Sequence, residues 1–146
     1  MADVTMFFTE DEKTELGSAL LNATYRTTGE IRIRVEKKAG RKPLDAARRA
    51  FLQLGMRGSQ DKNGVLFYIS VFDRKFAVFG DDGINKKVGR EFWETVKKAV
   101  VEKFSGRQFA IGLNGGIGIV AEKLAEFFPD EKIDLKENPD AITFEK

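Results

Sequence analysis

The sequence contains no cysteine and no histidine among its 146 residues. Without cysteine, the chain has no disulfide, no thiolate metal site and no cysteine nucleophile. Without histidine, it lacks the usual general base at neutral pH and the usual zinc ligand. These two absences exclude Ser-His-Asp hydrolases, histidine and cysteine phosphatases, and zinc peptidases. Any metal ion would be bound through oxygen, which favours calcium, magnesium or manganese.

Long apolar runs are missing as well. No stretch reaches the roughly 20 apolar residues of a membrane helix, and residues 1–8 lack the basic start and apolar core of a signal peptide. We therefore expect no membrane segment and a cytoplasmic location. The formal net charge of +2 is too small to indicate nucleic-acid binding by itself. We expect a monomer, and the sequence leaves open whether a protein partner exists.

The hydrophobic pattern predicts alternating strands and helices. Strict alternation over Glu30–Glu36 predicts a strand with one apolar and one charged face. The apolar run Gly64–Phe72 predicts a strand buried on both faces, and the turn Asp73-Arg74 joins it to a returning strand, Lys75–Phe79. Apolar residues at helical spacing predict helices at about residues 10–26, 43–54, 88–104 and 109–128.

These elements predict one domain over residues 1–129. A charged C-terminal extension, 130–146, follows it and is either loose or ends in an edge strand through Ile142–Phe144. The first strand, the second helix and the second strand form a βαβ unit, so the two strands should be parallel with a right-handed crossover. With the antiparallel third strand, this predicts an α/β fold, a three-layer α/β/α sandwich with a small mixed sheet flanked by helices.

The expected topology places three polar loops at the same edge of the sheet. Glu30 begins the first strand, Asp61 and Asn63 precede the second, and Asp81 and Asp82 follow the third, which runs the opposite way. Carboxylate and amide oxygens are the ligands that calcium and magnesium prefer. The topology therefore predicts a divalent-cation site formed by these five residues. The alternative is that the Asp and Asn residues only form turns.

Two other functions use nearby residues. A metal-dependent phosphatase would use the same edge, with Glu30 or Asp82 as the base and Lys62 or Arg57 holding a phosphate. A binder of anionic partners would use the basic stretch 26–57, which has ten Arg and Lys residues against three acids. That surface would include Arg32, Arg34 and Arg41. Few aromatic residues interleave with these charges, so the pattern does not favour nucleic acid.

Several short motifs occur in a specific order along residues 8–129. They are Thr28-Gly29-Glu30, Phe51–Met56, Lys62-Asn63-Gly64, Asp73-Arg74, Phe79–Ile84, Phe92-Trp93 and the stretch Phe104–Leu113. In this order they resemble the TPM domain, a family of many bacterial proteins and a plant thylakoid-lumen protein linked to photosystem II repair.

The resemblance implies an α/β/α sandwich, divalent-cation binding for some members, and a weak acid phosphatase activity for the plant member. The family motifs fall on Thr28-Gly29-Glu30, Asn63-Gly64 and Gly80-Asp81, the loops that the topology already places together. We therefore expect a soluble TPM-type domain that binds calcium or magnesium and acts as a binding or interaction module. Many relatives carry a signal peptide and a membrane anchor, which we do not expect here.

Overall fold

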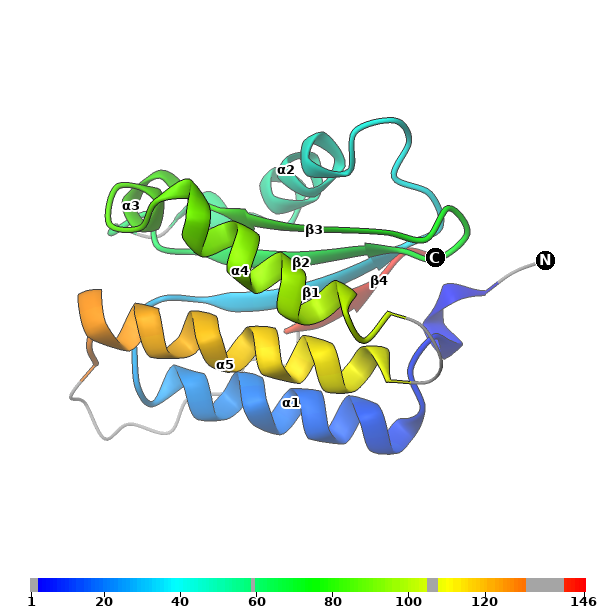
Figure 1. The fold of residues 1–146 in the computed structure, drawn as a ribbon, viewed down its shortest axis with the longest axis horizontal. Helices are drawn as coiled ribbons and strands as arrows, with labels where there is room; N and C mark the ends of the chain where they lie inside the picture. Colours follow the sequence, from blue (N-terminus) through cyan, green and yellow to red (C-terminus); the bar gives the residue numbers. More distant parts are fainter. Residues whose placement is uncertain (1–2, 59, 105–107, 131–140) are drawn as a thin grey trace.

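A four-stranded mixed sheet with helices on both faces forms the centre of the computed structural model (Figure 1). The structure describes residues 3–58, 60–104, 108–130 and 141–146. The strands are β1 (Ile31–Glu36), β2 (Val65–Ser70), β3 (Lys75–Gly80) and β4 (Ile142–Phe144), in the order β3-β2-β1-β4. The α/β sandwich predicted from the sequence is confirmed.

Strand pairing follows the predicted topology. β1 and β2 are parallel, from Ile31 opposite Val65 onward, and the helix α2 (Pro43–Gln53) connects them. β2 and β3 form the antiparallel hairpin. β4 lies parallel to β1 at the other edge, so the edge-strand alternative for the tail is the one that the structure shows. Residues 131–140 of the expected extension lie outside the described residues.

Three long helices cover one face of the sheet (Figure 1): α1 (Glu10–Thr24), α4 (Arg90–Val101) and α5 (Phe109–Phe127). With the short 3-10 helix η1 (Val4–Met6) they bury the larger core against Ile33, Phe67 and other inward side chains. A capping box starts α1, since the Thr9 hydroxyl accepts from the Glu12 amide at 3.0 Å. No helix in the described part of the chain is long and apolar enough to cross a membrane.

The opposite face of the sheet carries α2 and the short 3-10 helix η2 (Met56–Gly58). α2 packs on β2 and β3, with Ala46, Ala47, Ala50 and Phe51 buried. Leu44 in the first turn of the same helix is 54% exposed and takes no part in this core. β2 is buried along its whole length, as its continuous apolar composition predicts.

The segment before α4 differs from the predicted helix over 88–104. A separate short helix, α3 (Asp82–Asn85), follows β3 directly, and α4 begins at Arg90 after its N-cap Gly89. Gly80 at the end of β3 lies flat against the Trp93 ring, which an added Cβ would overlap. This close approach fixes the position of the loop that contains Asp81.

Candidate functional site

The three polar loops meet, as the topology predicts. The Asp81 amide donates to the Gly64 carbonyl at 3.0 Å, and the Ile84 amide donates to the Lys62 carbonyl at 3.2 Å. Gly83 packs so closely on the Asp61 carbonyl that a Cβ would overlap it. We call this junction of residues 27–30, 61–64 and 80–84 the loop edge.

Asp81 is the buried carboxylate of the loop edge, with 4% of its surface exposed. It caps α3, since its Oδ1 accepts from the Asp82 amide at 2.8 Å. Its Oδ2 atom is also buried, and none of the described residues donates a hydrogen bond to it. A buried, unsatisfied carboxylate oxygen costs free energy, because it has left water without gaining a donor. A cation or a water molecule at this atom would compensate the lost hydration.

Asn63 lies beside Asp81 in the loop edge and is 1% exposed. Its Nδ2 donates to the Thr28 hydroxyl at 3.1 Å, which joins the loop before β2 to the loop before β1. Thr27, which sequence reasoning did not single out, anchors the latter loop to the end of α5. Its hydroxyl donates to the Phe128 carbonyl at 2.6 Å and accepts from the Gly29 amide at 2.9 Å.

The other three predicted ligands do not surround Asp81. Glu30 is half-buried and forms an ion pair with Arg32 at 3.0 Å, while the side chains of Asp61 and Asp82 are exposed. Across residues 3–58, 60–104, 108–130 and 141–146, no three acidic side chains are arranged to hold a metal ion. The fold brings the three loops together, but their carboxylates do not point to a common centre. Cation binding by the five residues stays a prediction.

The two arginines on the charged face of β1 form ion pairs with acidic residues of the same chain segment. Arg34 Nε pairs with Glu36 Oε2 at 3.0 Å, and the buried Tyr68 hydroxyl donates to Glu36 Oε1 at 2.6 Å. Burial raises the pKa of Tyr68, and its hydrogen bond to the Glu36 carboxylate raises it further. Because Arg32 and Arg34 both have carboxylate partners, this face offers little free positive charge to an anionic partner.

The fold and the loop edge define a small mixed α/β domain with one buried carboxylate at a junction of three loops. The family model of the TPM domain matches residues 1–123. The chain belongs to the TPM domain family. This membership confirms the resemblance carried by the sequence motifs.

Solved structures include a relative of nearly equal length. The BA42 protein from the psychrophilic bacterium Bizionia argentinensis, solved by NMR, is 35% identical, with a TM-score of 0.86 over 99% of this chain and 100% of that one. The N-terminal domain of a protein from P. gingivalis is 16% identical, with a TM-score of 0.62 over 83% and 78%. That of the cg2496 protein from Corynebacterium glutamicum is 12% identical, with a TM-score of 0.58 over 95% and 81%. The last two share the fold. No curated protein matches the chain.

Proposed function

We propose that this TPM domain binds one divalent cation, calcium or magnesium, at the loop edge and acts as a binding or interaction module. The observation that carries the proposal is the buried Asp81 carboxylate, whose Oδ2 receives no hydrogen bond from the described residues. A hard cation would compensate this oxygen directly, since carboxylates are strong ligands of calcium and magnesium.

The donor set at the loop edge fits an ion that keeps part of its water shell. Asp81 supplies one charged oxygen and the Asn63 side chain an amide oxygen, while the Lys62 and Gly64 carbonyls already accept hydrogen bonds from the Ile84 and Asp81 amides, so water would complete the coordination. With one inner carboxylate, we expect modest affinity, because ligand charge tunes the affinity of such sites. Glu30, Asp61 and Asp82 would act at longer range by making the surroundings more acidic.

Titration of the protein with CaCl₂ or MgCl₂, followed by backbone amide shifts, tests the proposal. We expect saturable shifts confined to residues 27–30, 61–64 and 80–84. The Asp81→Asn variant should lose them, because it removes the charge while its side-chain oxygen still caps α3 through the Asp82 amide. The variant therefore remains folded, and loss of binding reports on the ligand itself.

Asp45→Asn is the matched control, since Asp45 is an exposed acid in the first turn of α2 on the far side of the sheet. Its titration should be unchanged. Shifts that spread over all acidic surfaces, or that survive Asp81→Asn, would show only diffuse counterion binding and would contradict the proposal.

The geometry does not favour the phosphatase alternative. A catalytic role would need a free base and a free phosphate-binding cation beside Asp81. Glu30 is paired with Arg32, and Lys62 Nζ donates to the Arg57 carbonyl at 3.0 Å. Asp82 and Arg57, the remaining candidates for these two roles, are exposed, whereas the Asp81 carboxylate is buried, so the binding role is the better supported one.

A further inference from the structure

The side of α2 that faces away from the sheet carries two exposed leucines. Leu44 is 54% and Leu52 45% exposed, and Arg48 lies between them, one helical turn from each. The three side chains form a row along the helix, opposite the buried Ala46 and Ala50. Figure 1 shows α2 at the top of the molecule, where no other described helix covers this row. The row is thus an apolar surface that the core does not use.

Positive charge lies at both ends of this row and beside it. Residues 37–60 contain seven lysines and arginines against one acid, Asp45. Six of the seven are exposed: Lys38, Arg41, Lys42, Arg48, Arg49 and Arg57. None of the six forms an ion pair with an acid of the described residues. We call these six residues, together with Leu44 and Leu52, the basic face.

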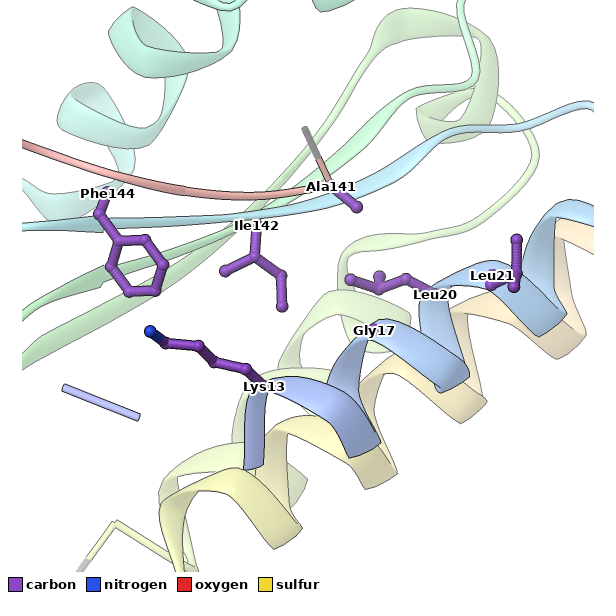
Figure 2. A pocket seen from close by; sticks show the side chains of 7 residues that line it. All are labelled: Lys13, Gly17, Leu20, Leu21, Ala141, Ile142 and Phe144. Carbon is purple, nitrogen blue, oxygen red and sulfur yellow. The ribbon is translucent and has the colours of Figure 1, made fainter. Parts of the chain in front are cut away.

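The groove between α1 and β4 lacks such free charge (Figure 2). It is lined by apolar side chains and by Lys13, and Lys13 already pairs with Glu10 at 3.2 Å. On the charged face of β1, Arg32 and Arg34 are likewise paired with carboxylates. The basic face therefore differs from both, because it combines exposed leucines with cations that have no counter-charge among the described residues.

The anchoring of the chain argues against an internal counter-charge for the basic face. The described residues that flank the acidic segment 131–140 are held beside β1: Pro129 bridges to Thr27, and the Ala141 carbonyl accepts from the Ile33 amide at 2.8 Å. The helix α2 instead packs on β2 and β3. A second copy does not suit this face either, because a two-fold contact would place like charges against each other. The partner is therefore an external anionic surface.

The leucines favour a bilayer among anionic surfaces. Nucleic acids are bound by cations at phosphates and by aromatic rings at bases, but the one aromatic residue of 37–60, Phe51, is buried. At a membrane surface, leucines enter the boundary between headgroups and acyl chains while lysines and arginines contact anionic headgroups. We propose that the basic face docks the domain on a membrane surface that contains anionic lipids, with α2 parallel to the bilayer plane. No residue of the loop edge takes part, so docking is independent of the proposed cation site.

Sedimentation with vesicles tests the docking, in a buffer with EDTA so that no cation at the loop edge bridges protein and lipid. We expect the protein to pellet with vesicles of phosphatidylcholine and phosphatidylglycerol, and not with phosphatidylcholine alone. Arg48→Glu/Arg49→Glu should weaken binding roughly twentyfold or more, because each basic residue near an anionic surface strengthens binding about fivefold. Leu44→Ser/Leu52→Ser should weaken it roughly threefold or more, since less apolar area enters the bilayer. All four side chains are exposed, so both variants should fold.

Lys97→Glu/Lys98→Glu is the matched control, since it changes the net charge equally at two exposed lysines of α4, on the other face of the sheet. It should pellet like the unchanged protein, and thermal melting should show all three variants folded. The proposal is overturned if the unchanged protein does not pellet with the anionic vesicles, or if the control loses as much binding as Arg48→Glu/Arg49→Glu. It is also overturned if Leu44→Ser/Leu52→Ser pellets like the unchanged protein, because charge alone would then suffice and a nucleic acid or an acidic protein would fit equally well.

Discussion

Tyr68→Phe tests the buried hydrogen bond between the middle of the sheet and the end of β1. The Tyr68 side chain is fully buried, and its hydroxyl donates to Glu36 at 2.6 Å. Phenylalanine keeps the ring and leaves no large cavity, so the loss is mainly one hydrogen bond to a charged acceptor. Such a bond contributes about 2 kcal/mol. We expect the free energy of unfolding at pH 7 to fall by about that amount.

The same substitution has a pH signature. The folded state holds the Tyr68 proton because its pKa is raised, whereas in the unfolded chain tyrosine ionises near pH 10. The stabilisation from this proton is complete below about pH 10 and declines as pH rises toward the folded pKa. The difference in stability between the unchanged protein and Tyr68→Phe should therefore shrink by about 1.4 kcal/mol between pH 9 and pH 11.

Urea unfolding at pH 7, 9 and 11, followed by the fluorescence of the single tryptophan, Trp93, measures this difference. Comparing the two proteins at each pH cancels the titration of lysines, which both share. A difference that stays constant from pH 9 to pH 11 would refute the assignment of the proton to Tyr68. A difference below about 0.5 kcal/mol at pH 7 would show that Glu36 finds another donor.

Two further predictions concern the loop edge. Gly83→Ala should lower the free energy of unfolding by about 2 kcal/mol, because the new Cβ overlaps the Asp61 carbonyl; urea unfolding measures it, and no loss would show that the loops separate freely. Thr27→Val should cost about 2 kcal/mol by removing the hydroxyl that joins the Gly29 amide to the end of α5. Faster hydrogen exchange at Gly29 would report this break, and unchanged exchange would contradict it.

The sheet could be predicted from the sequence because its signals are local. The charged and apolar faces of β1 alternate residue by residue, β2 has a continuous apolar run, and Asp73-Arg74 joins neighbouring strands. The helix α3 gave no such signal, since four residues are too few to show a periodicity. It forms because Asp81 caps it after the close contact of Gly80 with Trp93.

The candidate site could be predicted only at the level of loops. Topology determines which strand ends are neighbours, but side-chain direction depends on backbone conformation within each loop. Lys62 has φ of 51°, a left-handed conformation that an isolated sequence pattern does not indicate for lysine. The preceding Asp61 packs its backbone on Gly83 and leaves its side chain exposed.

The position of β4 in the chain affects how the protein is made. β1 acquires its partner β2 after about thirty further residues, but β4 emerges from the ribosome about a hundred residues after β1. Throughout that interval the flank of β1 that β4 later covers is unsatisfied, next to the apolar Ile33 and Val35. A growing chain stalled before residue 142 would therefore be a target for chaperones or for aggregation, although most of its core residues are already synthesised.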